Sequence, residues 1–559
     1  MSRSFRRVLT FAIGSLTVMA AGPGLASVQA SSQQKGLDGI NHIVVIYEEN
    51  HSFDNLYGGW EGVNGPAGAT NFAQIGQTTG AYACLLQNDV NLTSPPLAAD
   101  CNDVSHFHNQ PFSIESYIPP GAATCPKPGV FYLHGSTPDS TKNLQGGCTE
   151  DLVHRFYQEQ YQLNNGLQNH YVTGSDAVGL AMGYYDTTAL PIYTYLHSDG
   201  HPHYAIADDF FQSAFGGSFL NHQWLIAAAS PTYQDGPSDQ HAVLDTNGMT
   251  NTYPLYTKTN TTAHDGALTQ VCGATAFPGR ACGDFAVNTI QPTYQPTSSN
   301  PLKLPPQTGT TIGDKLSDAR VSWAWYSGGW SNANGDIGAP GWTNGATPTP
   351  EGKCGDPDST LNPIWPNCPN KVFQFHHQPL NYFYNFRPGT TARMDHLRDE
   401  AEFIQVANDS SKTCNLKSVS FVKPIGLENE HPGYTSVGSG SSHLVSLLKA
   451  IDSSACRKDT MVVVTYDEFG GQWDHVAPPG QGNNNGPHDQ WGPGTRIPAL
   501  VIAPRLRGEF VVDHTQYDTT SILATIESRY GLGSLRDGSR DGAVNDLSSV
   551  FAAHSPFDT

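Results

Sequence analysis

Two short apolar runs of the chain end directly in acidic side chains. The residues that follow them are Glu48, Glu49 and Asn50 after the first run, and Asp467 and Glu468 after the second. In open α/β sheets, ligands bind at the carboxyl ends of the strands. Two carboxylate pairs in one crevice would repel each other strongly unless a cation lay between them. The pattern therefore favours a divalent metal site, and the alternative is that these acids only cap the loops and helices that follow.

Five histidines form a second group of candidates. They occupy polar or Gly/Pro-rich segments outside the apolar runs, and they are His154, His376, His377, His431 and His475. Imidazoles in such positions can ligate a metal, stabilise phosphate oxygens or protonate a leaving group. In a chain with 22 histidines, ordinary surface and loop positions are the competing interpretation.

Ser218 is the candidate nucleophile. It follows Gly216 and Gly217, and two glycines allow close approach of the backbone to a ligand. The segment lacks the G-x-S-x-G form of the nucleophile elbow, so a Ser-His-Asp acyl-transfer site has no motif support. By spacing alone, Gly-Gly-Ser is most often a turn.

The elements that must position these residues can be read from hydrophobic patterning. Four short runs rich in Val and Ile, without polar alternation, are typical of strands buried on both faces; they are residues 43–47, 419–422, 461–466 and 499–503. Helical patterns lie between them, at 152–163, 189–197, 442–451 and 521–530. Alternating strands and helices predict a layered α/β fold.

Two stretches interrupt this pattern, at about 60–148 and 232–366. Both are dominated by Gly, Pro, Thr, Asn and Ser, and together they hold most of the ten cysteines. We expect disulfide-stapled loop insertions there rather than core. The rest of residues 31–559 is predicted to form a single domain.

Composition excludes several classes of protein. Glycine and proline contribute 57 and 39 of the 559 residues, which indicates a loop-rich globular protein rather than a coiled coil. The net charge of −21 argues against generic attraction to nucleic acid or to an anionic membrane. No apolar run beyond residue 30 is long enough to predict a transmembrane span.

The N-terminal residues 1–30 have the features of a secretory signal. Arg3, Arg6 and Arg7 precede an apolar run at 8–21, and small residues at 28–30 offer a cleavage site. The arginine pair also leaves a twin-arginine route open. We therefore expect export to the periplasm or beyond, where an even number of cysteines favours disulfides. The predicted pairs join near neighbours: 84–101, 125–148, 272–282, 354–368 and 414–456.

Several motifs, taken together and in order, resemble the bacterial phosphoesterase family of phospholipases C and acid phosphatases. They are YEENHSFD at 47–54, MGYY at 182–185, GSFLNH at 217–222, HHQP at 376–379, NEHPG at 429–433, YDEFGGQWDHVAPP at 466–479 and GPGTRIP at 492–498. The resemblance runs from about residue 40 to residue 530 and omits the two insertions. It implies an alkaline-phosphatase-like, three-layer α/β/α sandwich.

The resemblance also implies roles for individual residues. One divalent metal ion would be held by Glu49, Asn50, Ser218, Asp467 and Glu468. The pocket histidines would be His154, His376, His377 and His431, with His475 as a further candidate, and Asn221 and His222 would contact the substrate. Oxygen ligands suit calcium, magnesium or manganese, and the nearby histidines keep iron or zinc open.

These features predict an exported, metal-dependent acid phosphatase that hydrolyses small phosphomonoesters through a phosphoserine at Ser218. The motifs at 376–379 and 429–433 look closer to the phosphatase branch of the family. An acidic optimum is expected if the imidazoles bind phosphate best when protonated, below their reference pKa of about 6.5. The main alternative is a phospholipase C, which would also meet a lipid surface, and a non-catalytic exported binding protein is the third hypothesis. The sequence predicts no oligomeric state.

Overall fold

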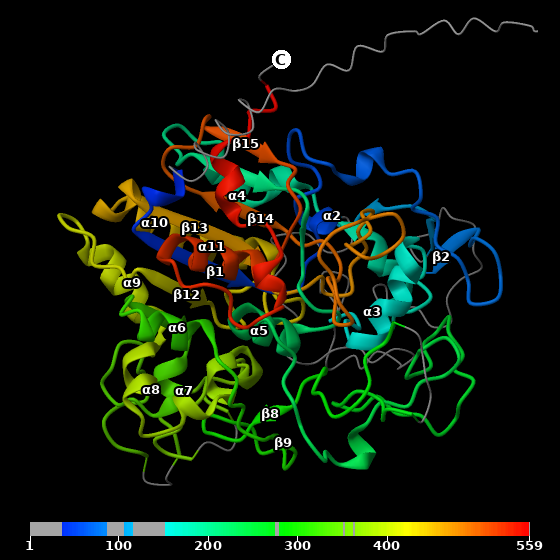
Figure 1. Cartoon of the computed structure of the whole chain (residues 1–559), viewed down its shortest axis with the longest axis horizontal. Coiled ribbons are helices and arrows are strands. Elements are labelled where there is room, and N and C mark those ends of the chain that lie inside the picture. The colour runs from blue at the N-terminus through cyan, green and yellow to red at the C-terminus, as the bar shows by residue number, and fades with distance from the viewer. Residues whose placement is uncertain are drawn as a thin grey trace, which may run out of the picture.

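The computed structural model describes residues 36–86, 106–115, 151–273, 279–349, 353–360 and 364–557. Its centre is an eight-stranded sheet (Figure 1). In spatial order the strands are β11 (Leu397–Asp399), β10 (Trp323–Ser327), β12 (Val419–Lys423), β1 (His42–Glu48), β13 (Thr460–Tyr466), β14 (Ala499–Ile502), β6 (Tyr204–Ala207) and β15 (Phe510–Asp513). Of these strands, β14 runs antiparallel to both neighbours, and the other pairings are parallel.

The four predicted apolar runs are the strands β1, β12, β13 and β14. Every residue of β13 is buried, as is every residue of β1 after its first. A strand covered on both faces cannot present a polar side chain to either of them, so its sequence shows no alternation. The prediction of buried central strands is therefore confirmed.

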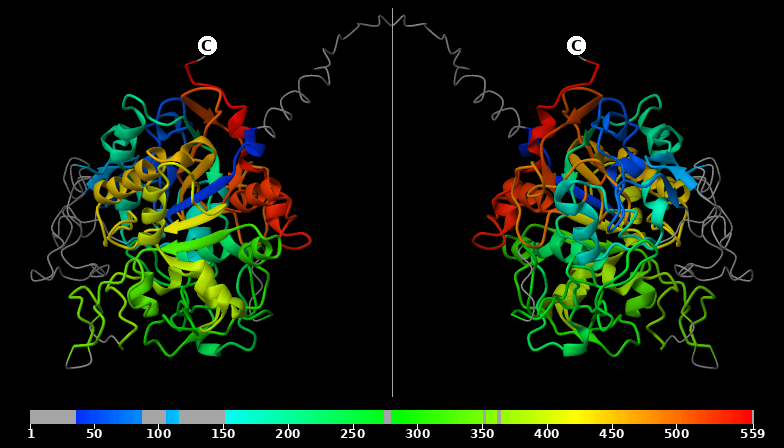
Figure 2. Two further views of the ribbon diagram at one scale, coloured as in Figure 1. Left: turned by 90° about the vertical axis from the view of Figure 1, so that its left-hand side faces the viewer. Right: turned by 90° about the vertical axis from the view of Figure 1, so that its right-hand side faces the viewer.

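Helices cover both faces of the sheet and make three layers (Figures 1 and 2). One face carries α4 (Pro191–Leu196), α9 (Glu400–Asp409) and α10 (Val437–Asp452), which pack together. The other carries α5 (Ser218–Ala227), α6 (Ile312–Asp318) and α11 (Thr520–Tyr530). The predicted three-layer α/β/α arrangement is confirmed.

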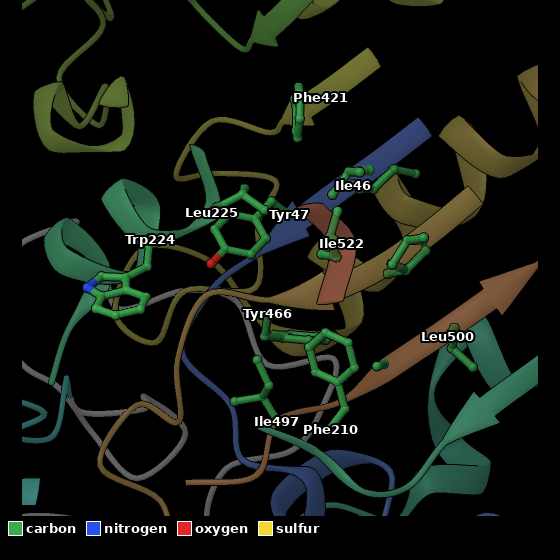
Figure 3. Packing of buried hydrophobic residues seen from close by; sticks show 14 of the residues in the cluster. Ile46, Tyr47, Phe210, Trp224, Leu225, Phe421, Tyr466, Ile497, Leu500 and Ile522 are labelled. Atoms are coloured by element: carbon green, nitrogen blue, oxygen red, sulfur yellow. The ribbon is translucent and has the colours of Figure 1, made fainter. Parts of the chain in front are cut away.

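The hydrophobic core extends over both faces of the sheet, and Figure 3 shows part of it. Tyr47 of β1 is 1% exposed, and Leu225 of α5 and Ile522 of α11 have no measurable exposure. Burying such a side chain stabilises the fold by roughly 1.5–3 kcal/mol. The core thereby fixes the position of α5, and with it the position of Ser218, relative to β1.

Shorter elements surround this core. The remaining helices are α2 (Phe53–Leu56), α3 (Phe156–Leu163), α7 (Trp330–Asn334) and α8 (Thr391–His396). The two-stranded pairs are β2 (Cys84–Leu86) with β3 (His106–His108), β4 (Phe112–Ser113) with β5 (Gly183–Tyr184), β7 (Phe210–Phe211) with β16 (Tyr517–Asp518), and β8 (Gln291–Pro292) with β9 (Lys303–Leu304).

The stretch at 232–366, predicted as a loop insertion, is only partly irregular. It contains α6, α7 and β10, and β10 pairs with β12 inside the central sheet. The sequence of β10 is rich in aromatic residues rather than in Val and Ile. The search for short Val/Ile-rich runs therefore did not predict this strand. Part of the predicted insertion is therefore core. The other predicted insertion lies largely outside the described residues.

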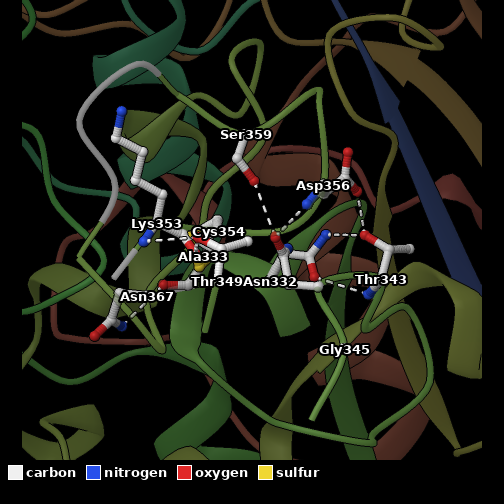
Figure 4. The surroundings of a disulfide bond; sticks show 12 residues. Asn332, Ala333, Thr343, Gly345, Thr349, Lys353, Cys354, Asp356, Ser359 and Asn367 are labelled. Atoms are coloured by element: carbon white, nitrogen blue, oxygen red, sulfur yellow. Dashed lines mark hydrogen bonds between the residues drawn. A yellow bond between two sulfur atoms is a disulfide. The ribbon is translucent and has the colours of Figure 1, made fainter. Parts of the chain in front are cut away.

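Three of the five predicted disulfides are present: Cys272–Cys282, Cys354–Cys368 and Cys414–Cys456. Around Cys354, the loop is also held by side-chain amides, since the Thr343 amide donates to Asn332 Oδ1 at 3.0 Å (Figure 4). Cys84 is disulfide-bonded. The other predicted cysteines, Cys101, Cys125 and Cys148, lie outside the described residues, as does the predicted signal at 1–30. Within the described residues, no helix has the length and hydropathy needed to cross a bilayer.

Candidate active site

The ends of β1 and β13 bring the two acidic motifs together. These strands pair in parallel, with Glu48 opposite Tyr466. Beyond them, the Asp467 amide donates a hydrogen bond to the Glu48 carbonyl at 3.1 Å, and the Asn50 amide donates to Asp467 Oδ1 at 3.1 Å. Asn50 has a φ of 61°, a left-handed conformation that asparagine adopts more readily than most residues. The adjacency of the two motifs thus follows from strand pairing.

Ser218 is the first residue of α5 and contacts the segment after β1. Its Oγ donates a hydrogen bond to Glu49 Oε2 at 3.0 Å. The preceding glycines are required sterically: Gly216 has a φ of 92°, and a Cβ on Gly217 would lie 2.9 Å from His154 Cδ2. The start of a helix also offers backbone N–H groups and a favourable dipole to an anion. This position suits a nucleophile beside a phosphate.

Three buried oxygens near Ser218 have no hydrogen-bond partner among the described residues. They are Asn50 Oδ1, Asp467 Oδ2 and Glu468 Oε1. Glu468 Oε1 and Asp467 Oδ2 each have an imidazole nitrogen within 3.8 Å but accept no hydrogen bond. A buried oxygen without a hydrogen bond is costly, and a hard divalent cation binds oxygens of this kind. Burial first, and Asp467 next, raise the pKa of both Glu49 and Glu468 well above the usual range. A cation would relieve this repulsion, so the buried groups are compatible with a metal site.

The other oxygen of Glu49, Oε1, faces three basic side chains. Lys423 Nζ lies 2.5 Å from it, His377 Nδ1 3.3 Å and His222 Nε2 3.7 Å. The two imidazoles stack with their ring centroids 4.8 Å apart. Glu49, His222 and His377 therefore form a cluster whose ligand-type atoms lie within 4.8 Å of one another. Nitrogen donors this close keep iron and zinc open beside the oxygen-preferring metals.

A cavity of about 540 Å³ lies in front of Ser218. His154, His376 and His431 line it, whereas His222 and His377 are not among its lining residues. Its other lining side chains are mainly polar, and they include Asp151, Asp176, Gln240, Asn251, Asp265, Asn288 and Gln374. The predicted pocket histidines are thus divided between the cavity wall and the surroundings of Glu49.

The pKa values of these histidines bear on the expected acidic optimum. Burial, with Lys423 next, lowers the pKa of His376 to about 3. Burial also lowers the pKa of His431 and His377 well below the ordinary value. The expectation of an acidic optimum assumed imidazole pKa values of about 6.5. For these three histidines the lowered pKa values do not support that assumption, and the acidic optimum stays a prediction.

Asn221, predicted to contact the substrate, holds the turn that precedes Ser218. Its Oδ1 accepts a hydrogen bond from the Ala214 amide at 2.9 Å, and its Nδ2 donates to the carbonyls of Ala214 and Gly216 at 3.0 and 3.2 Å. The side chain is fully buried and does not line the cavity. Both the oxygen and the nitrogen of the Asn221 carboxamide are therefore engaged by the backbone of the turn.

We expect Asn221→Leu to lower the free energy of unfolding by about 1–3 kcal/mol, because the buried Ala214 amide loses its acceptor. The inhibition constant of inorganic phosphate should change little in the folded protein. Gln223→Leu is the matched control, since the buried amide of Gln223 has no hydrogen-bond partner among the described residues and its removal should cost little. Urea unfolding and phosphate inhibition measure both effects. A selective loss of phosphate binding with unchanged stability would return Asn221 to a substrate-binding role.

His475 lies in a separate network around the buried guanidinium of Arg496. His475 Nδ1 is 2.6 Å from Asp54 Oδ2, and Asp54 Oδ1 accepts from Arg496 Nη2 at 2.8 Å. Asp474 Oδ1 accepts from Arg496 Nε at 3.1 Å. None of these four residues lines the cavity. The network joins the segments after β1 and β13 to the segment before β14, and His475 belongs to it rather than to the group around Ser218.

Replacing Arg496 with methionine should therefore act on stability. Removing one partner of a buried ion pair costs about 3–5 kcal/mol, because the remaining charges lose their compensation. The exposed pair Lys371–Asp358 provides a control, and Lys371→Met should cost only about 0.2–1 kcal/mol. Denaturant unfolding measures both variants. An Arg496→Met protein that kept its full stability but lost bound metal would contradict this assignment.

Sequence reasoning missed two residues near Ser218. Lys423 ends β12 and was not predicted to contact Glu49. Glu159 of α3 is fully buried and accepts hydrogen bonds from the Thr495 amide at 2.7 Å, from Gln212 Nε2 at 2.9 Å and from the Gly216 amide. The available signals were weak: a lysine that follows the apolar run at 419–422, and an acid inside the helical pattern at 152–163.

Comparison with known proteins identifies the family. Residues 40–533 match the Phosphoesterase family, which is most of the chain. The chain belongs to this family. Its resemblance to that family, inferred from the motifs, is confirmed, and family membership makes the chain a hydrolase of phosphoric ester bonds. The hypothesis of a non-catalytic binding protein is accordingly not supported.

Several proteins with similar sequences are named phospholipase C. The chain is 24% identical to Phospholipase C A of Mycobacterium tuberculosis (strain ATCC 25618 / H37Rv), over 93% of this chain and 78% of that protein. It is 24% identical to Phospholipase C B of the same strain, over 96% and 82%. A solved structure of a Vibrio parahaemolyticus protein in the alkaline phosphatase superfamily aligns over 66% of both chains, with 10% identity and a TM-score of 0.29.

Proposed function

We propose that this phosphoesterase is an exported, metal-dependent phosphatase that hydrolyses phosphomonoesters through a phosphoserine at Ser218. The observation that carries the proposal is the hydrogen bond of 3.0 Å from Ser218 Oγ to Glu49 Oε2, at the start of a helix and next to a polar cavity. A hydroxyl in this position has a proton acceptor on one side and space for a phosphoryl group on the other.

The residues support a two-step reaction. Ser218 Oγ passes its proton toward Glu49 and attacks phosphorus, and the bond from phosphorus to the ester oxygen breaks. His154, His376 and His431 line the space where the phosphoryl oxygens would lie, and His154 would protonate the leaving oxygen. Water then hydrolyses the phosphoserine and releases phosphate. A divalent ion bound by Glu49, Asn50, Asp467, Glu468 and Ser218 would supply charge neutralisation and lower the pKa of the serine hydroxyl.

The polar cavity favours a phosphomonoester of a hydrophilic alcohol over a phospholipid. A phospholipase C must accommodate a second ester arm and two acyl chains, which calls for extensive apolar surface. The wall in front of Ser218 is instead mixed, and its polar side chains, which include three carboxylates and five carboxamides, outnumber the apolar ones. This argument supports the monoesterase, which is also what the motifs at 376–379 and 429–433 predict.

Phospholipase C activity is the second candidate, and the names of the relatives favour it. Both candidates share the attack by Ser218 and differ in the group attached to phosphorus. Rates measured side by side on glycerol 2-phosphate and on phosphatidylcholine vesicles would separate them. We expect the soluble monoester to react at least about tenfold faster in kcat/KM, a difference of about 1.4 kcal/mol in transition-state binding. Dominant release of diacylglycerol would overturn the choice.

Export is part of the proposal. Three disulfides in the described residues are consistent with an oxidising compartment. The predicted signal at residues 1–30 and the single domain over 31–559 remain predictions. N-terminal sequencing of the protein recovered from the periplasm or medium would test the predicted cleavage, and recovery of only full-length cytoplasmic chain would contradict it.

A further inference from the structure

Part of the stretch predicted as a loop insertion at 232–366 builds one wall of the cavity in front of Ser218. It supplies nearly half of the residues that line the cavity, whereas Ser218 and the pocket histidines come from other segments. We call this part the insertion wall; it consists of residues 240, 251, 253, 265–267, 287–289, 300 and 302. The alcohol of a phosphoester bound at Ser218 would lie in the same cavity, so the insertion wall is placed to contact it.

Backbone hydrogen bonds hold three segments of the insertion wall side by side. The Leu268 amide donates to the Gln240 carbonyl at 3.0 Å, and the Asn288 amide donates to the Ala267 carbonyl at 3.1 Å. One of the three disulfides closes the loop between the second and third segments. The wall therefore presents its side chains from a fixed backbone, which a site needs if it is to select one ligand over another.

Asp265 fixes the guanidinium of Arg155 in the cavity wall. The Asp265 carboxylate is 4% exposed, forms an ion pair with Arg155 Nη1 and accepts a hydrogen bond from Asn288 Nδ2 at 3.2 Å. The carboxamide oxygen of Asn288 accepts from the Phe156 amide at 3.3 Å, which ties the insertion wall to α3. Arg155 Nε and Nη2 make no hydrogen bond to the described residues, and both lie on a cavity-lining side chain. They are therefore available as donors to a ligand.

Two carboxamides of the cavity also have unused hydrogen-bonding capacity. The side chains of Gln240 and Gln374 line the cavity, are half-buried and make no hydrogen bond to the described residues. Each carboxamide offers an oxygen that accepts and a nitrogen with two donor hydrogens. Together with Arg155, these side chains give the cavity both donors and acceptors for the alcohol of the substrate.

The carboxylates of the cavity, by contrast, are engaged with nearby protein groups. Asp265 pairs with Arg155, and Asp176 Oδ1 accepts from the Val153 amide at 2.8 Å. Asp151 Oδ1 lies 3.5 Å from His154 Nδ1. The groups left to meet a ligand are therefore two neutral carboxamides and one guanidinium.

This set of groups fits hydroxyls better than a charged substituent. A hydroxyl both donates and accepts, so it can pair with either end of a carboxamide and also accept from the guanidinium. An ammonium group donates only, and it would be repelled by Arg155. A second anionic group would meet three carboxylates and an arginine that is already paired. A hydroxyl-rich alcohol satisfies all three free side chains.

We propose that the substrate is a phosphomonoester of a polyhydroxylated alcohol, as in a sugar phosphate, and that Gln240, Gln374 and Arg155 bind its hydroxyl groups. This inference rests on the proposed phosphomonoesterase function and narrows it to one class of leaving group. A site that hydrogen-bonds a hydroxyl rejects an analogue without it, because the polar groups of the site then stay unpaired. The three side chains are specificity-determining residues in this sense.

The test uses the full chain and substrates of matched shape. Glucose 6-phosphate and cyclohexylmethyl phosphate both carry a six-membered ring on a methylene phosphate, and only glucose 6-phosphate has hydroxyl groups. A third substrate, 6-aminohexyl phosphate, represents a cationic alcohol. The ratio kcat/KM is measured for the wild type, Gln240→Leu and Gln374→Leu. Calorimetry gives the dissociation constants of the two ring phosphates in a Ser218→Ala background, where turnover does not interfere.

Gln291→Leu is the matched control. Gln291 belongs to the same stretch, is also half-buried and makes no side-chain hydrogen bond to the described residues, but it does not line the cavity. Thermal unfolding shows whether each variant is folded. We expect little change in melting temperature, because none of the three glutamine side chains loses a hydrogen bond.

We expect the wild type to prefer glucose 6-phosphate over cyclohexylmethyl phosphate by at least about hundredfold in kcat/KM. Gln240→Leu and Gln374→Leu should each lower this preference by about fivefold or more, and weaken binding of glucose 6-phosphate in the Ser218→Ala background by a similar factor. Gln291→Leu should keep the wild-type preference. A loosened fold would lower the rates on both ring phosphates together and leave their ratio unchanged.

Equal kcat/KM for the two ring phosphates would overturn the inference, and so would faster hydrolysis of 6-aminohexyl phosphate than of glucose 6-phosphate. Full retention of the preference in both folded variants would overturn the assignment to Gln240 and Gln374. Should the variants fail to fold, the wild-type ratio decides. A wild-type chain that hydrolyses none of the three phosphomonoesters would refute the proposed function itself, whereas similar rates on all three would refute the inference alone.

Discussion

Replacing Ser218 with alanine is expected to lower kcat for phosphoester hydrolysis by roughly 10⁴-fold or more, because covalent catalysis loses its nucleophile. Stability and bound metal should change little. Ser218 Oγ makes one side-chain hydrogen bond, to Glu49 Oε2, and alanine is compatible with the first turn of a helix. Single-turnover rates and the metal content of the same preparation measure the two effects.

Ser213→Ala provides the matched control for this variant. Ser213 is also fully buried and lies just before the same turn, but its Oγ bonds to Asp518 Oδ1 at 3.3 Å, away from the cavity. Its loss should lower stability and leave kcat within a few-fold of the wild type. Near-normal hydrolysis by Ser218→Ala would remove Ser218 from the role of nucleophile.

Asp467→Asn should cost most of the bound metal and, with it, most of the activity. The two oxygens of Asp467 have different environments: Oδ1 accepts hydrogen bonds from the amides of Asn50 and Glu468, whereas Oδ2 has no hydrogen-bond partner among the described residues. The side-chain oxygen of an asparagine can still accept these two hydrogen bonds. The substitution therefore removes the negative charge of the carboxylate and keeps the bonds. If Asp467 is a metal ligand, Asp467→Asn should therefore lose the metal with only a modest change in the free energy of unfolding.

Asp399→Asn is the control for a buried acid that only supports backbone structure. Its carboxylate accepts the amides of Ser331 and Ala401 and caps α9. It should lose about 0.5–2 kcal/mol of stability and keep full metal occupancy. Metal stoichiometry, melting temperature and phosphatase rate are measured on one preparation of each variant. Full occupancy and full activity in Asp467→Asn would rule out a shared metal site.

The sequence predicted the elements whose physical pattern is local. The runs at 43–47 and 461–466 are strands because unbroken β-branched residues fit a sheet covered on both faces. The missed strands of the central sheet, β11, β10, β6 and β15, are aromatic or short, and they are completed by pairing with strands distant in the sequence. Patterning within a window cannot report such long-range pairing.

For the candidate site, residue types were predictable but surroundings were not. The acids after two buried strands indicated a shared cation because parallel strands end at one edge of a sheet. Asn221 and His475 lie within the recognised motifs, yet the structure directs one to a turn and the other to the Arg496 network. Lys423 contacts a carboxylate far away in the sequence. Proximity along the chain does not reveal which face of an element a side chain occupies.

The most direct test of the central claim is to trap the covalent intermediate. The wild-type protein is mixed with excess phosphomonoester, quenched in acid within one turnover, digested and analysed by mass spectrometry. The account predicts a phosphoryl group on the peptide that contains Ser218, on Ser218 itself, and its absence from Ser218→Ala. A protein that turns over substrate rapidly while no phosphoserine is detected, or that carries the phosphoryl group on another residue, would contradict the mechanism.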